Sequence, residues 1–202
     1  MSGFGLVSRE TRVRLDAFAA LLLRWNQSIN LVGRCDAAAL WSRHIADSLQ
    51  LVPLIPRGLS HGIDLGTGGG FPGLVLAIAS DIPFDLIESD HRKAAFLREA
   101  GRVTRAPVRV HAVRAEDMKV DPAAFITARA LAPLPRLLAL ATPHLRPGGI
   151  CLFLKGAAVE SELTAAAAGW HMQVERISSQ TAQDAWILRI SDIARVDDNA
   201  RP

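Results

Sequence analysis

The segment from Ile63 to Gly73 constrains the fold of this chain more than any other part of the sequence. It reads Ile-Asp-Leu-Gly-Thr-Gly-Gly-Gly-Phe-Pro-Gly, an apolar run followed by a cluster of glycines. Glycine permits positive φ angles and lets a ligand approach the backbone closely. Pro72 suits the first turn of a helix, and the start of that helix would offer free N–H groups to a polar ligand. The segment therefore predicts a buried strand, a ligand-binding loop and a helix in succession.

From residue 61 onward, short apolar runs alternate with segments of helical pattern. Such alternation is typical of a parallel sheet with right-handed crossovers. We expect strands at 63–65, 84–88, 108–113, 124–129 and 150–154. We expect helices between them at 71–79, 90–102, 133–143 and 157–168. Only a polar turn separates the apolar runs 171–176 and 185–190, which is too short for a crossover and predicts an antiparallel hairpin.

The residues before this alternation have a helical pattern of their own. In the segment 9–25, apolar side chains recur at helical spacing, at Leu15, Phe18, Leu22 and Trp25. A polar break follows, and Asp36 is placed to cap a second helix that would run to about Leu51. Prolines and a glycine between residues 53 and 58 then mark a boundary.

The length of 202 residues suits one compact unit rather than two full domains. The fold class that we expect is α/β, with a doubly wound, mostly parallel seven-stranded sheet that ends in an antiparallel hairpin. Residues 1–58 would form an N-terminal helical extension and residues 59–202 the main domain. No leader or membrane-spanning run is recognisable, and Cys35 and Cys151 match no metal or redox spacing. We therefore expect a cytoplasmic protein without a metal site.

Two cofactor classes are compatible with the glycine loop. Residues 68–73 satisfy G-x-G-x-x-G, the fingerprint of dinucleotide sites. Asp64, however, stands two residues before Gly66, where a carboxylate could accept hydrogen bonds from an ammonium group. S-adenosyl-L-methionine carries such a group and a dinucleotide does not. Glu88, at the end of the second predicted strand, is placed to bind the ribose hydroxyls of either cofactor. Asp64 and the predicted terminal hairpin favour S-adenosylmethionine.

Motifs outside the loop resemble one family. Before the loop come Trp25-Asn26, Asn30-Leu31-Val32 and Arg43-His44-Ile45-Ala46-Asp47-Ser48-Leu49. After it come Arg114-Ala115-Glu116, Ala128-Arg129-Ala130 and Lys155-Gly156. In order and spacing, these stretches resemble the bacterial 16S ribosomal RNA guanine-N7 methyltransferases, also called glucose-inhibited division protein B, over about residues 8–157. The sequence departs from the family pattern at Val32, where threonine is more usual, and we give this little functional weight.

The resemblance implies an activity and a set of site residues. The activity is transfer of a methyl group from S-adenosyl-L-methionine to N7 of a guanine in 16S ribosomal RNA, which leaves S-adenosyl-L-homocysteine. The cofactor residues that we expect from the loop and the resemblance together are Asp64, Gly66, Gly68, Phe71, Glu88, Ala115, Glu116 and Arg129. The substrate contacts that we expect are Asn30, His44, Arg92 and Lys155. The Arg129 guanidinium could meet either the carboxylate of the cofactor or an RNA phosphate.

We expect no catalytic residue, because guanine N7 is a lone-pair nucleophile without a proton to remove. His44 and Asp47 would share a helix face. They could form a polar rim toward the cofactor or RNA, or a His–Asp hydrogen bond that docks the N-terminal helices. Three other functions stay open: a division-associated binding protein without catalysis, a nicotinamide-dependent oxidoreductase and a small-molecule methyltransferase.

Charge is distributed unevenly along the chain. The net charge is +3 overall, but +7 over residues 91–146 and −5 over residues 61–90, which include the glycine loop. Basic segments are either nucleic-acid footprints or ordinary arginine-rich surface. With the family resemblance, the partner that we expect is 16S ribosomal RNA or a small-subunit particle, bound by a monomer away from any membrane.

Overall fold

A seven-stranded sheet forms the centre of the computed structural model, which describes residues 7–56, 58 and 61–196. The strand order is β3-β2-β1-β4-β5-β7-β6. The strands are β1 Gly62–Leu65, β2 Phe84–Ile87, β3 Val108–His111, β4 Ala123–Arg129, β5 Leu145–Lys155, β6 Trp170–Ser178 and β7 Trp186–Arg195. Strands β1 to β5 pair in parallel, whereas β7 runs antiparallel to both β5 and β6. The predicted doubly wound sheet with a terminal hairpin is confirmed.

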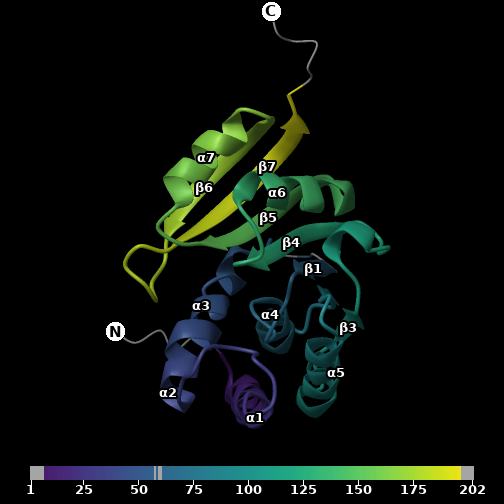
Figure 1. Ribbon diagram of the computed structural model, residues 1–202, viewed down its shortest axis with the longest axis vertical. Helices are drawn as coiled ribbons and strands as arrows, with labels where there is room; N and C mark the ends of the chain where they lie inside the picture. Colours follow the sequence, from purple (N-terminus) through teal and green to yellow (C-terminus); the bar gives the residue numbers. More distant parts are fainter. Residues whose placement is uncertain (1–6, 57, 59–60, 197–202) are drawn as a thin grey trace, which may run out of the picture.

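Helices cover both faces of the sheet (Figure 1). On one face lie α1 Arg9–Trp25, α4 Gly73–Ser80 and α5 His91–Thr104, and on the other lie α6 Leu134–Ala141 and α7 Val159–Ala167. Two apolar clusters follow from this arrangement, because successive side chains of a strand point to opposite faces. In β4, Phe125 belongs to the cluster under α4 and α5, while Ile126 belongs to the cluster under α6 and α7.

The N-terminal helices pack on the main sheet through α4 and α5. Helix α1 contacts both of them, and its Phe18 ring lies 5.5 Å from Phe71 and 6.3 Å from Phe96, measured between centroids. Asp36 caps the second helical segment as expected, since its side chain accepts the N–H of Ala39 at 2.8 Å. These helices therefore share one apolar cluster with the main domain.

The second helical segment is continuous but changes its winding. It consists of α2 Ala37–Leu40, a π-helical stretch η2 Trp41–Ile45 and α3 Ala46–Leu49. A π-helical stretch shifts the face on which later side chains point, and such stretches are frequent at functional sites. The described residues also include short 3₁₀ turns at η3 Val52–Leu54, η4 Ala115–Asp117 and η5 Thr142–His144. Within the described ranges, no helix combines the length and apolar character that crossing a membrane requires.

Candidate active site

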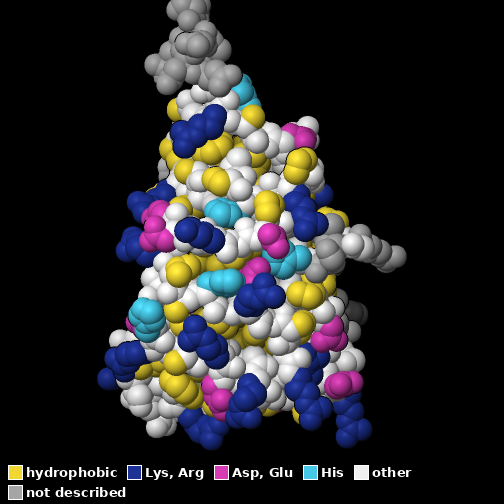
Figure 2. Space-filling view, turned by 90° about the vertical axis from the view of Figure 1, so that its right-hand side faces the viewer, with side chains coloured by type: hydrophobic (Ala, Val, Ile, Leu, Met, Phe, Trp, Pro, Cys, Tyr) yellow, Lys and Arg dark blue, Asp and Glu magenta, His cyan; other side chains and the backbone are white. Residues whose placement is uncertain are grey.

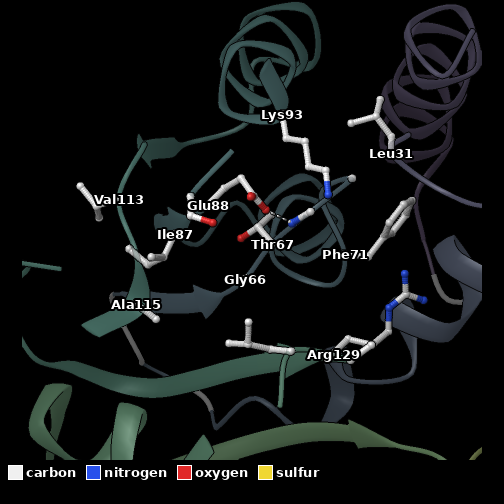
Figure 3. A pocket seen from close by; sticks show the side chains of 15 residues that line it. Leu31, Gly66, Thr67, Phe71, Ile87, Glu88, Lys93, Val113, Ala115 and Arg129 are labelled. Carbon is white, nitrogen blue, oxygen red and sulfur yellow. Dashed lines mark hydrogen bonds between the residues drawn. The ribbon is translucent and has the colours of Figure 1, made fainter. Parts of the chain in front are cut away.

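A cavity of about 350 Å³ opens at the carboxyl ends of β1, β2 and β4. In the sheet, β2 lies on one side of β1 and β4 lies on the other. The direction in which successive strands are added therefore reverses at β1. Ligands of open α/β sheets bind at such switch points. Six of the eight cofactor residues expected from the sequence line this first cavity, some of them shown in Figure 3: Gly66, Gly68, Phe71, Glu88, Ala115 and Arg129.

Two glycines shape the floor of the first cavity. Gly66 has a φ of 65°, and a Cβ there would lie 2.6 Å from Cδ1 of Leu131. Gly68 has a φ of 56°, but a Cβ there would meet only the Gly66 carbonyl oxygen, at 3.8 Å. Backbone conformation therefore favours glycine at both positions, and crowding adds to this at Gly66.

Glu88 holds the glycine loop from the end of β2. Its Oε2 accepts the Gly68 N–H and its Oε1 accepts the Asp90 N–H, both at 2.8 Å. The residue is buried, and its carboxylate lies at the wall of the first cavity (Figure 3). Each carboxylate oxygen has two lone pairs, so the group keeps acceptor capacity beyond these two bonds.

Asp64 lies beneath the loop and not on the cavity wall. Its side chain is fully buried, where Oδ2 accepts the Gly73 N–H at 3.0 Å and Oδ1 accepts the Thr127 hydroxyl at 2.7 Å. Burial raises the pKa of Asp64 to about 6, against the opposing effect of these hydrogen bonds. Asp64 therefore braces β1 against β4 and against the start of α4.

The expectation that α4 begins with free N–H groups is wrong. The Gly73 N–H is taken by Asp64, and the Leu74 N–H donates to the Gly70 carbonyl at 3.2 Å. A Cβ at Gly73 would lie only 2.4 Å from the Asp64 Cβ, so this close approach requires glycine. The N–H groups of Gly73 and Leu74 are therefore unavailable to a ligand. Gly66, Gly68 and the end of β2 form the polar floor of the first cavity instead.

Arg129 connects the first cavity with the N-terminal helices. At the end of β4, its guanidinium carbon lies 5.0 Å from the centroid of the Phe71 ring. Its Nη1 lies 3.4 Å from Oδ2 of Asp47 and 3.5 Å from the Arg43 carbonyl oxygen. Burial lowers the pKa of Arg129, while the Asp47 carboxylate acts in the opposite direction.

His44 lies behind the Phe71 ring, in the π-helical stretch. The two ring centroids are 5.2 Å apart, and the buried Nδ1 of His44 has no hydrogen-bond partner among the residues that the structure describes. Burial, and then the positive charge of Arg129, lower the pKa of His44 to about 4. His44 is therefore neutral at neutral pH; it does not line the first cavity, and its ring packs against Phe71, which does.

The hydrogen bond between His44 and Asp47, one of the two alternatives left open by the sequence, is not formed among the described residues. Oδ1 of Asp47 instead accepts the Thr181 hydroxyl at 2.7 Å and the Gln50 side-chain amide at 2.8 Å. Gln50 in turn accepts the Gln180 N–H at 2.8 Å. The N-terminal helices are thus docked on the turn between β6 and β7. The sequence does not predict this contact, because its partners lie some 130 residues apart in polar, turn-like stretches.

Glu116 is placed apart from its neighbour Ala115. Ala115 lines the first cavity, whereas the half-exposed Glu116 faces an adjoining hollow and pairs with Arg136 and Arg114. Those ion pairs hold the Glu116 carboxylate outside the first cavity.

The four expected substrate residues fall into separate places. Asn30 and Arg92 are exposed and do not line the first cavity; Asn30 lines a separate hollow that shares Leu31 with it, and Arg92 donates to the Ser28 carbonyl at 2.8 Å. The segment around Asn30 is held by Asn26, whose side-chain oxygen accepts the backbone N–H groups of Leu31 and Val32. His44 lies behind Phe71, as described above, and Lys155 lies in a second cavity.

The second cavity, of about 440 Å³, lies beside the first at the carboxyl ends of β4 and β5. Both cavities are lined by the segment 129–131, so they adjoin there. In the second cavity the buried Lys155 donates to the Ala132 carbonyl at 2.9 Å and to Oε2 of Glu162 at 2.6 Å. The sequence does not mark Glu162 as a site residue, because it lies in a segment with an ordinary amphipathic helical pattern.

Positive charge is spread over the face shown in Figure 2. On the face shown in Figure 2, lysine and arginine side chains are distributed from end to end, with acidic and histidine side chains between them. Several arginines are tied up in ion pairs, among them Arg14 with Asp81 and Arg102 with Glu99. Lysine and arginine side chains therefore do not form one continuous patch on this face.

Comparison with solved structures shows the same fold in methyltransferases. An O-methyltransferase from Bacillus cereus in complex with SAH has a TM-score of 0.62 at 16% identity, with 93% of this chain and 98% of that chain covered. The N-methyltransferase NodS from Bradyrhizobium japonicum with S-adenosyl-L-homocysteine also has a TM-score of 0.62 at 16% identity, with 87% and 98% covered. At this level of identity the likeness concerns the fold alone.

Comparison of sequences is more specific. The chain is 58% identical to the ribosomal RNA small subunit methyltransferase G of Acidiphilium cryptum, over 94% of this chain and 89% of that protein. It is 57% identical to the protein of the same name from Gluconobacter oxydans, over 94% and 98%. The family model described as rRNA small subunit methyltransferase G matches residues 12–186. The chain therefore belongs to the rRNA small subunit methyltransferase G family.

Proposed function

We propose that this protein transfers a methyl group from S-adenosyl-L-methionine to N7 of a guanine in 16S ribosomal RNA, with the cofactor in the first cavity. The observation that carries the proposal is Glu88 at the end of β2, facing a loop of positive-φ glycines at the switch point of the sheet. Family membership favours S-adenosylmethionine over a nicotinamide dinucleotide, and RNA over a small molecule.

The residues of the first cavity fit the parts of this cofactor. The remaining acceptor sites of Glu88 suit ribose hydroxyls, and the apolar side chains of Ile87 and Val113 suit the faces of an adenine ring. Gly66 and Gly68 leave room for the chain of the cofactor along the floor. The Arg129 guanidinium would bind either the carboxylate of the cofactor or an RNA phosphate.

Two of the expected cofactor residues would act without touching the cofactor. Asp64 would hold the loop and the start of α4 from below, since both of its oxygens are occupied. Glu116 would fix the turn after β3 through Arg136, while Ala115 supplies the cavity wall.

Methyl transfer to guanine N7 needs alignment rather than proton removal. The bound cofactor supplies a methyl group on a sulfonium sulfur, which is a good leaving group. N7 already carries the lone pair that attacks, so the protein needs to hold N7, methyl carbon and sulfur in line, which is a proximity effect. His44 would contribute by packing against Phe71, because its lowered pKa and position suit no base at the reacting atoms.

The substrate is either the 16S ribosomal RNA or a small-subunit particle, and we propose that a monomer acts on it in the cytoplasm. Asn30 and Arg92 are exposed and adjoin Leu31 and Lys93 of the first cavity in the chain, so they would meet RNA around the target nucleotide. Arginine contacts to phosphates would make this binding weaker at higher salt.

Thermal unfolding of the purified protein tests the cofactor assignment. S-adenosylhomocysteine at a hundred times its Kd should raise stability by about 2.7 kcal/mol, and NAD should leave the melting temperature unchanged. A shift with NAD alone would indicate the oxidoreductase. If neither compound shifts the melting temperature, the result would favour a division-associated binding protein without catalysis.

A further inference from the structure

We propose that the second cavity receives the target guanine and that Glu162 recognises its Watson–Crick edge. The inference rests on the proposed function, because it concerns the substrate of that reaction. It adds a residue, Glu162, that would select guanine and that does not line the first cavity.

The position of the second cavity suits the methyl acceptor. It adjoins the first cavity along 129–131 and opens at the carboxyl ends of β4 and β5. Its walls include Leu131, 38% exposed, together with Pro133 and Leu154, which are apolar surfaces that a base can pack against. A base held there would lie beside whatever occupies the first cavity.

The chemistry of guanine fixes which edge must face which wall. N7 and O6 are acceptors on one edge, whereas N1–H and the N2 amine are donors on the opposite side of the base. If N7 points at the first cavity, the two donors point at the far wall of the second cavity. That wall then needs a hydrogen-bond acceptor, and a single carboxylate oxygen carries two lone pairs that can accept neighbouring N–H groups.

Glu162 is the carboxylate that has an oxygen available for this task. It lines the second cavity and not the first, and its side chain is 21% exposed. Its Oε2 accepts both the Leu134 N–H and the Lys155 ammonium at 2.6 Å. Its Oε1 accepts no hydrogen bond from any residue in the described part of the chain.

Asp47 also lines the second cavity but is already engaged. Its Oδ1 accepts bonds from Thr181 and Gln50, and its Oδ2 faces Arg129. Lys155 likewise uses its ammonium on Glu162 and on a carbonyl, which fixes the Glu162 side chain in place. Lys155 therefore becomes a positioning residue rather than the direct substrate contact expected from the sequence.

This arrangement would discriminate between bases. Adenine presents an acceptor at N1 and no amine at C2, so it would leave the Glu162 carboxylate facing a lone pair. A site built to hydrogen-bond a substrate donor rejects analogues that lack it, because the buried acceptor is left unpaired. Inosine keeps N7, O6 and N1–H but lacks the N2 amine, so it removes one of the two donors.

The experiment compares guanine with inosine at the methylated position. The position is first mapped with the wild-type protein, and two ribosomal RNAs are then assembled that carry guanosine or inosine there. Rates are measured for wild type, for Glu162→Gln and for Glu160→Gln. Glu160 lies on the same helix, is exposed and pairs with Arg176, so its variant removes an equal charge away from the cavity.

Wild type and Glu160→Gln should prefer guanosine by about tenfold or more in kcat/KM, as expected for one hydrogen bond to a charged group. Glu162→Gln should be slower on guanosine and should lose the preference, with unchanged affinity for S-adenosylhomocysteine by calorimetry. If the single variant does not fold, because Lys155 is left without its partner, Glu162→Gln with Lys155→Met replaces it.

Equal rates of wild type on guanosine and inosine would overturn the inference. Full discrimination by a folded Glu162 variant would also overturn it, since another group would then read the edge. Both results differ from failure of the proposed function, in which wild type would methylate neither RNA.

Discussion

The Glu88 carboxylate accepts the backbone N–H of Gly68 at 2.8 Å and so joins the end of β2 to the glycine loop. Replacement of Glu88 by alanine removes this bond and the acceptor proposed for the ribose. We expect binding of S-adenosylhomocysteine to weaken by about 1.5–3 kcal/mol, the usual value of a hydrogen bond to a charged group. Isothermal calorimetry measures this directly.

A matched control for Glu88→Ala is Glu99→Ala. Glu99 is partly exposed on α5, pairs with Arg102 and does not line the first cavity. Its removal should leave the affinity unchanged. Equal affinities of all three proteins would remove Glu88 from the proposed cofactor site.

Acidification should destabilise the protein through His44. The pKa of this group is about 4 in the folded protein, below its ordinary value of 6.5, so the unfolded chain binds the proton more readily. Its contribution to the free energy of unfolding is therefore complete above pH 6.5 and is lost as the pH falls toward 4. His44→Gln should lose less stability than wild type between pH 7 and pH 5 in urea unfolding. A variant with the same loss as wild type would contradict the buried, neutral state of His44.

Asp64 should act in the opposite direction over nearly the same range. Its pKa is raised from 3.8 to about 6, so the folded protein binds this proton more tightly than the unfolded chain. Stability from this group therefore increases as the pH falls from about 6 toward 3.8. Asp64→Asn removes that gain and should lose more stability than wild type on acidification. The amide can still accept the Gly73 N–H and can donate to the Thr127 oxygen, so folding should be kept.

Asp64→Asn also separates two roles of that residue. A brace beneath the loop predicts nearly unchanged affinity for S-adenosylmethionine in the variant, measured by calorimetry at pH 8. A large loss of affinity in a stable Asp64→Asn protein would show instead that the charge itself attracts the cofactor ammonium.

What could be predicted from the sequence was local. The strand, the glycine loop and the Glu88 position lie within one short stretch, and the Asp36 cap needs only its own helix. Alternation of apolar runs was enough to predict which segments form strands and the terminal hairpin, although the element ends shifted by a few residues.

What could not be predicted depends on contacts between distant segments. The burial of Asp64 requires Thr127 of β4, and the docking of Asp47 requires Thr181, far along the chain. The π-helical winding at His44 has no pattern of its own in a sequence that reads as one helix. The Lys155–Glu162 pair likewise depends on how α7 packs over β5.

The rate of methyl transfer should show no requirement for a general base. In single-turnover measurements at saturating cofactor and RNA, we expect little change in rate between pH 6 and pH 9, because N7 loses no proton. His44→Gln should lower the rate, if at all, by the same factor at every pH, through its packing on Phe71. A steep increase in rate with pH that disappears in His44→Gln would identify His44 as a base.

The central claim is methylation of guanine N7 in small-subunit ribosomal RNA, and mapping 7-methylguanine tests it most directly. Ribosomal RNA from cells that lack the gene is compared with RNA from unaltered cells by chemical cleavage at 7-methylguanine. We predict that one site in 16S ribosomal RNA is missing and is restored by the purified protein with S-adenosylmethionine. An identical cleavage pattern in both RNAs, or restored methylation at an atom other than N7, would contradict the account.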